Sequence, residues 1–165
     1  MQLSTERLLI RDMVPSDAPF ILDLVNQPAF HQNIGDKDIR SIADAEDYIL
    51  TSGTEGYERL GFGMYLVMLD ATPIGICGLL QRPFLKHPDV GFAFDENHWN
   101  QGYGTEATRA MVNHATESLG FTQLSAFTAV NNAASGRLLE KAGFRFDGVK
   151  PLTPELGPVA TYEYP

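Results

Sequence analysis

One stretch of the sequence, residues 89–119, limits the choice of fold more than any other. Its first residues, from Asp89 to Asp95, alternate between large apolar side chains and small or polar ones, which is the period of a β-strand. A glycine-containing loop follows, and after it apolar residues recur at helical spacing until Gly120, a typical helix stop. The stretch therefore predicts a strand, a tight loop and a long helix in direct succession.

The loop of this stretch, residues 101–106, has the character of an anion site. The first turn of a helix has backbone N–H groups without intrahelical partners and lies at the positive end of the helix dipole. Gly102 and Gly104 let the backbone turn sharply and approach a ligand closely. The junction favours phosphate or pyrophosphate as the ligand, with a plain structural turn as the alternative.

A dinucleotide is one ligand that such a loop could bind. Gly102, Gly104 and Ala107 match the G-x-G-x-x-G/A fingerprint. That fingerprint directly follows its strand, and an acidic residue stands about 20 positions later. Here residues 95–100 separate the strand from the loop, and no acidic residue stands near Leu124. The sequence therefore disfavours dinucleotide binding.

Length and composition indicate an ordinary globular protein. The chain has 165 residues, 44% of them hydrophobic and 20% charged, which predicts a single domain over residues 1–165. It has no apolar run of bilayer length and no signal-peptide core near its first residue, so we expect a cytoplasmic protein and no membrane partner. The net charge of -9 disfavours nucleic acid, and it either favours a cationic substrate or serves only solubility.

Cysteine and histidine give no sign of metal chemistry. The single cysteine, Cys77, lies in an apolar run and is expected to be a buried thiol. The four histidines, His31, His87, His98 and His114, show no metal-ligand spacing, so we predict no metal.

The remaining elements follow from periodicity and from turn residues. Strands are predicted over residues 7–13, 61–69, 74–80, 124–130, 144–149 and 159–164, helices over 15–25, 41–50 and 133–142, and loops over 31–40, 51–59, 81–88 and 151–158. Ser41 and Asp44 fit a capping box, and Asn132 is a natural N-cap. Short hairpins combined with crossover helices predict an α+β fold with a mixed, mostly antiparallel sheet flanked by about four helices.

Four motifs occur in a fixed order along nearly the whole chain. They are Thr5-Glu6-Arg7-Leu8-Leu9-Ile10-Arg11, then Pro73-Ile74-Gly75 with Gly78, then Trp99-Asn100-Gln101-Gly102-Tyr103-Gly104, and finally an N-x-x-S-x-x-L-x-E-K-x-G-F block from Asn132 to Phe144. Together they resemble the GNAT superfamily of acyl-CoA N-acyltransferases, in its RimJ/RimL-like branch. Trp99 departs from the family's usual Arg or Gln at the start of the pyrophosphate loop, although an aromatic residue there is familiar in this branch.

The resemblance implies a GNAT-type fold and a function. The expected reaction is N-acetyl transfer from acetyl-CoA to a primary amine, either a protein N-terminus or a small amine, by direct attack in a ternary complex. The alternative is a catalytically weak or inactive module of the same fold that binds acyl-CoA or another protein. The resemblance leaves the acceptor open, and it leaves open whether the protein is a monomer or a homodimer.

The resemblance also implies which residues bind acetyl-CoA. The backbone of Phe92 and Phe94 would run along the pantetheine arm and offer an N–H group to the thioester oxygen. The loop would wrap the pyrophosphate, and Asn132 would contact the arm. The loop residues are Gln101, Gly102, Tyr103, Gly104, Thr105 and Glu106.

Three residues are candidates for the catalytic roles. The resemblance would place Ser135 near the cofactor sulfur, where many relatives have a tyrosine as general acid, and its alternative role is to satisfy the backbone at the helix start. Asp89 stands where relatives place an acidic residue facing the amine, and its alternative role is a solvated carboxylate at the strand end. Glu155 in the late proline-rich loop is a second candidate base. Water could also carry the proton away without a direct base.

Overall fold

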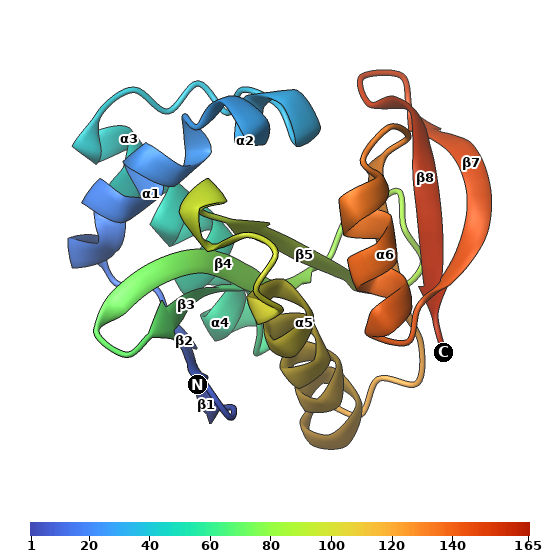
Figure 1. Cartoon of the computed structure of the whole chain (residues 1–165), viewed down its shortest axis with the longest axis horizontal. Coiled ribbons are helices and arrows are strands. Elements are labelled where there is room, and N and C mark those ends of the chain that lie inside the picture. The colour runs from blue at the N-terminus through green and yellow to red at the C-terminus, as the bar shows by residue number, and fades with distance from the viewer.

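Eight strands form one sheet at the centre of the protein, whose computed structural model describes residues 1–165 (Figure 1). Their spatial order is β1-β2-β3-β4-β5-β6-β8-β7. The strands are β1 (Gln2–Ser4), β2 (Leu8–Asp12), β3 (Met64–Leu69), β4 (Thr72–Leu80), β5 (Asp89–Phe94), β6 (Leu124–Ala129), β7 (Arg145–Thr153) and β8 (Gly157–Tyr164).

Helices cover both faces of this sheet. They are α1 (Ala18–Val25), α2 (Pro28–Asn33), α3 (Ile42–Ile49), α4 (Glu55–Leu60), α5 (Tyr103–Asn113) and α6 (Ala133–Lys141). Short 3-10 turns, η1 (Pro15–Asp17) and η3 (Glu96–His98), and π-helical turns, η2 (Leu50–Thr54) and η4 (His114–Ser118), extend or link them. No helix of the fold is both long enough and apolar enough to span a bilayer.

The sheet separates two apolar cores, as the alternation of side chains along a strand requires. On β4, Cys77 and Leu79 face the core that contains Met111 of α5 and Leu139 of α6. Ile76, the residue before Cys77, faces the other core, which α1 and α3 complete. The two halves of the chain therefore build one sheet with a different set of helices on each face.

One pair of neighbouring strands is hardly paired. Every other pair is antiparallel and extended, whereas β5 and β6 are parallel and meet in register at Asp89 and Ser125 alone. The Ser125 N–H donates to the Pro88 carbonyl at 2.9 Å. Beyond this point β5 pairs only with β4, and β6 only with β8. The sheet thus splits into two parts, with α6, β7 and β8 on one side of β5 and α1 to α3 on the other (Figure 1).

The predicted fold class is confirmed, and so are the local caps. The side chains of Ser41 and Asp44 accept each other's backbone N–H groups at 3.1 Å, and the Asn132 side chain accepts the Ser135 N–H at 3.2 Å. Gly120 ends its helix with φ 78°, in the left-handed region that glycine adopts readily.

Four elements differ from the sequence predictions. The expected loop over residues 51–59 is helical, and the expected loop over 31–40 begins with the last turn of α2. Strand β1 was not predicted, and the hairpin of β7 and β8 extends through most of the expected loop 151–158. Over residues 51–59, tertiary contacts prevail over the low helix propensity of glycine. Gly56 packs so closely that a Cβ added to it would lie 2.6 Å from the Phe62 carbonyl oxygen.

Candidate functional site

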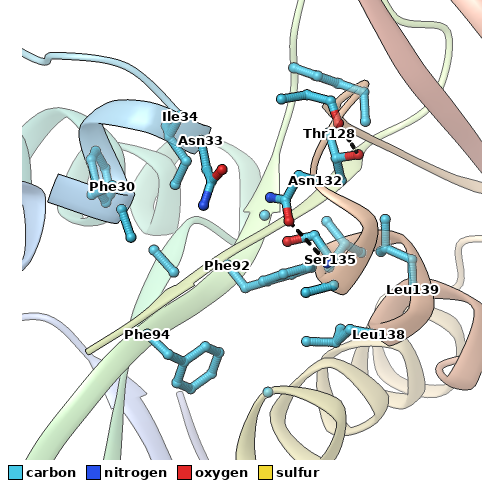
Figure 2. A pocket seen from close by; sticks show the side chains of 18 of the residues that line it. Phe30, Asn33, Ile34, Phe92, Phe94, Thr128, Asn132, Ser135, Leu138 and Leu139 are labelled. Atoms are coloured by element: carbon cyan, nitrogen blue, oxygen red, sulfur yellow. Dashed lines mark hydrogen bonds between the residues drawn. The ribbon is translucent and has the colours of Figure 1, made fainter. Parts of the chain in front are cut away.

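A cleft of about 1150 Å³ opens where β5 and β6 diverge. Its lining comes from both faces of the sheet, because the gap between the strands passes through the sheet. Figure 2 shows Phe30, Asn33 and Ile34 on one side of β5, and Asn132, Ser135 and Leu138 on the other. A ligand that lies along β5 on one face of the sheet can therefore be contacted by a second ligand that enters from the other face.

The free edge of β5 turns its backbone toward this cleft. The Asp95 N–H donates to the Ile74 carbonyl of β4, and hydrogen-bonded positions alternate along an antiparallel pair. Ala93 and Gly91 therefore bond to β4, whereas the amides of Phe92 and Phe94 point to the side that β6 has left. The Phe94 carbonyl already accepts the Trp99 indole N–H at 2.9 Å. Two backbone donors thus remain directed at the cleft.

The start of α5 supplies further free donors. Gly102 is its N-cap with φ 82°, and no side chain caps the helix. The first backbone bond of the helix runs from the Glu106 N–H to the Gly102 carbonyl. The N–H groups of Tyr103, Gly104 and Thr105, which line the cleft, have no protein partner. This is the arrangement that binds phosphate groups at helix starts.

Gln101 and Glu106, expected to bind the same ligand, lie outside the cleft lining. The Glu106 carboxylate accepts from the Thr5 hydroxyl and the Arg7 Nε at 2.7 Å each, and the Arg7 backbone N–H at 2.8 Å. Arg7 also donates to the Gln101 carbonyl at 2.9 Å and lies 4.5 Å from the centre of the Tyr103 ring. The first motif of the sequence therefore holds the loop in place.

Asn132 and Ser135 point from the start of α6 toward the cleft (Figure 2). The cap uses the Ser135 backbone N–H and one oxygen of Asn132. The Ser135 hydroxyl and the Asn132 amide nitrogen make no hydrogen bond within the protein. The capping role and a ligand-binding role are therefore compatible for both residues.

Asp89 lies at the vertex where β5 and β6 separate, and only 2% of its surface is exposed. Both of its carboxylate oxygens accept from the Arg82 Nε at 3.1 Å. Burial raises the pKa of Asp89 to about 6, because desolvation of the carboxylate outweighs its attraction to Arg82. The group is still ionised at neutral pH, and it is a stronger base than an ordinary carboxylate.

Glu155, the second candidate base, is not brought to the site. It is exposed in the turn between β7 and β8 and does not line the cleft. Its neighbours Leu156 and Pro158 do line it, so the turn borders the site through apolar side chains.

Sequence reasoning missed several polar residues of the cleft, among them one from each of three separate segments. Lys37 follows α2, Tyr48 belongs to α3, and Arg82 lies between β4 and β5. They come from segments without a recognisable motif, and only the packing of α2 and α3 beside β5 brings them together. Cys77, in contrast, is the buried thiol that the sequence predicted, and burial raises its pKa to about 12.

Comparison with known proteins adds family information to this geometry. Residues 7–145 match the family described as Acetyltransferase (GNAT) domain. An uncharacterized N-acetyltransferase of Bacillus subtilis (strain 168), YoaA, is 27% identical over 151 residues, which cover 89% of this chain and 84% of that protein.

Solved structures share the fold along its whole length. The crystal structure of an acetyltransferase from Agrobacterium tumefaciens str. C58 superimposes with a TM-score of 0.83 at 24% identity, covering 100% of this chain and 94% of that one. RimL, a ribosomal L7/L12 alpha-N-protein acetyltransferase in complex with coenzyme A, gives 0.86 at 18% identity, with 99% and 97% covered.

Proposed function

The chain belongs to the GNAT acetyltransferase family, and we propose that it transfers the acetyl group of acetyl-CoA to a primary amine within a ternary complex. The observation that carries the proposal is the split between β5 and β6, which directs two backbone N–H groups into a cleft that is open on both faces of the sheet.

The residues of one side of the cleft fit acetyl-CoA. The free amides of Tyr103, Gly104 and Thr105 match the charge of a pyrophosphate. Farther along, the edge of β5 offers donors to an extended amide-containing chain, as a neighbouring strand would accept them. Bound acetyl-CoA would supply the activated acyl carbon and a thiolate leaving group.

The other requirements are charge stabilisation and proton transfer. An amide of β5, at Phe92 or Phe94, would donate to the thioester oxygen as negative charge develops there. The amine nitrogen forms its bond to the acyl carbon while the bond to sulfur breaks. Asp89 would accept the proton that the amine loses, directly or through a water molecule, and the Ser135 hydroxyl would donate a hydrogen bond to the departing thiolate.

Calorimetric titration with acetyl-CoA tests the proposal, with NADH as the control. We expect micromolar binding of acetyl-CoA, no heat with NADH, and free-thiol release when amines are added. Binding without thiol release across amine acceptors would favour the inactive acyl-CoA-binding module. A folded protein that does not bind acetyl-CoA would contradict the proposed role of the α5 start.

A substitution at Thr105 tests the phosphate site without disturbing the fold. Gly102 and Gly104 are poor choices, since Gly102 has a positive φ and a side chain on Gly104 would lie 2.6 Å from Leu138. Glutamate is favourable in the first turn of a helix, so Thr105→Glu should fold normally while repelling phosphate. We expect acetyl-CoA affinity to fall at least about tenfold, with a smaller loss for the neutral control Thr105→Gln.

A further inference from the structure

The charge of the cleft is opposite to the charge of the protein. The chain carries a net charge of -9, but Asp89 is the only acidic residue in the cleft lining. The same lining contains four basic residues, Lys37, Arg82, Arg137 and Lys141. Arg137 and Lys141 belong to α6, on the acetyl-CoA side. Lys37 and Arg82 lie on the other side, where the amine would enter.

Arg82 is held rigidly, and part of it is left free to bind. Its Nε contacts both oxygens of Asp89, and its guanidinium lies 5.0 Å from the centre of the Phe127 ring. Neither of its terminal Nη groups donates a hydrogen bond within the protein. A planar fork of N–H donors, packed against an aromatic ring on a residue that lines the cleft, matches the geometry of a carboxylate or phosphate.

Lys37 adds a second positive charge without a partner. It makes no ion pair, although the chain has many carboxylates. The concave surroundings remove part of its hydration and, together with the nearby Arg82, lower the pKa of Lys37. Asp89 pairs with Arg82 alone, so Lys37 leaves an excess positive charge in the cleft lining, which an anionic ligand would neutralise.

The distance between these groups limits the size of the ligand. Asp89, the proposed base, contacts Arg82 directly at 3.1 Å. An amine that gives its proton to Asp89 and an anion bound by Arg82 must therefore lie only a few atoms apart. Phe127, which lies against the Arg82 guanidinium, and Phe30 and Ile34, which also line the cleft, would face an apolar part of the ligand.

We propose that the acceptor is a small amino acid-like molecule, whose anionic group is bound by Lys37 and the Nη groups of Arg82 while its amine faces Asp89. The proposal rests on the acetyl transfer proposed above. The overall negative charge does not oppose it, because charges beyond about 8 Å are largely screened at physiological ionic strength and contacts within the cleft decide binding.

Matched acceptors test the need for an anionic group. Thiol release from acetyl-CoA would be measured with leucine and leucinamide, and with phenylalanine and phenylalaninamide. The members of each pair differ in the carboxylate. We expect kcat/KM to be at least about tenfold higher for each amino acid than for its amide at equal concentration of the neutral amine.

Variants assign that preference to the cleft. Lys37→Gln should lower kcat/KM for the amino acid by about tenfold and leave kcat/KM for the amide unchanged. Lys37→Glu should reverse the preference, so that the amide becomes the better acceptor. Lys86→Gln is the matched control, because Lys86 is an exposed residue of the segment that carries Arg82 but does not line the cleft. A preference unchanged in Lys37→Glu would overturn the assignment.

Binding gives a readout that is independent of turnover. The protein saturated with CoA would be titrated with N-acetylleucine and N-acetylleucinamide, and we expect tighter binding of the carboxylate. The anionic subsite would be contradicted if the two compounds bound equally or not at all. It would also be contradicted if amides or neutral peptides were the preferred acceptors, and acetyl transfer itself would remain intact in each case. Failure to bind acetyl-CoA itself would instead contradict the proposed function.

Discussion

Asp89 combines two properties that rarely occur together in a carboxylate. It is almost completely buried, yet it lies on the lining of an open cleft and contacts a cation. Burial disfavours the charged form and Arg82 favours it, and the balance brings the pKa near 6. A general base works best when its pKa is close to the operating pH.

The pH dependence of acetyl transfer should follow this ionisation. Below about pH 6 Asp89 is protonated and cannot accept a proton, so kcat/KM should rise as the pH increases through about 6. Asp89→Asn should lose this inflection and about 100-fold or more in rate, keeping only the dependence caused by ionisation of the amine. Rates of both proteins between pH 5 and 8 check this, and an identical profile for the two would exclude Asp89 as the base.

Ser135 allows chemistry to be separated from stability. Its backbone N–H completes the cap of α6, whereas its hydroxyl is free. Ser135→Ala should therefore lower kcat with little change in the free energy of unfolding or in the affinity for acetyl-CoA. Steady-state rates, calorimetry and thermal unfolding check the three expectations. An unchanged kcat would show that water alone assists the thiolate.

Among the secondary-structure elements, β4 explains why the second motif contains glycines. A Cβ on Gly75 would lie 2.5 Å from the Phe94 ring and 2.6 Å from the Ala93 carbonyl. A Cβ on Gly78 would overlap the Gly63 carbonyl oxygen. These residues let β4 lie close to β3 and β5, and Gly75 does so at the end of β5 that faces the cleft.

Gly75→Ala should therefore disturb both folding and ligand binding. The added methyl group displaces β5 near Phe94, which we expect to cost roughly 1–3 kcal/mol of stability and to weaken acetyl-CoA binding. Gly91→Ala on β5 is the control for stability, since its methyl group would meet its nearest neighbours at 3.8 Å or more. Denaturant unfolding and calorimetry of both variants check this. Equal stability of the two would contradict the role of Gly75.

The elements that could be predicted from the sequence are those with strong local sequence features, such as caps and turn residues. The capping box at Ser41, the cap at Asn132 and the left-handed Gly120 each depend on contacts within a few residues. The helical segment over residues 50–60 does not, because it contains Gly53 and Gly56 and is held by Tyr57, whose hydroxyl accepts the Met13 N–H and donates to the Met64 carbonyl. Such contacts exist only after the chain has folded.

The same limit applies to the site. The loop and the N-x-x-S block could be found because each is contiguous in the sequence. Lys37, Tyr48 and Arg82 could not, because three separate segments carry them. The net charge, which indicates either a cationic substrate or solubility alone, is an average over the whole surface, whereas the cleft lining contains four basic residues and one acidic residue.

For the molecule as a whole, the split in the sheet determines which backbone amides a bound ligand would protect from hydrogen exchange. Without a ligand, the amides of Phe92, Phe94, Tyr103, Gly104 and Thr105 have no protein partner. Hydrogen exchange at these amides should therefore be fast in the free protein and slow with acetyl-CoA. Exchange measured residue by residue checks this, with the β3–β4 hairpin as the internal reference. Uniform slowing across the protein would indicate general stabilisation instead.

The passage of the cleft through the sheet has a further consequence for how new specificities arise. The proposed acetyl-CoA side of the cleft depends on the start of α5 and on backbone groups of β5. Both tolerate few substitutions because the fold itself requires them. The proposed acceptor side is built from side chains of α2, α3 and the segment before β5, on which the fold depends less. Substitutions there can change which amine is accepted while the acetyl donor stays the same. Paralogues of this chain should therefore differ in acceptor specificity and share one acetyl donor.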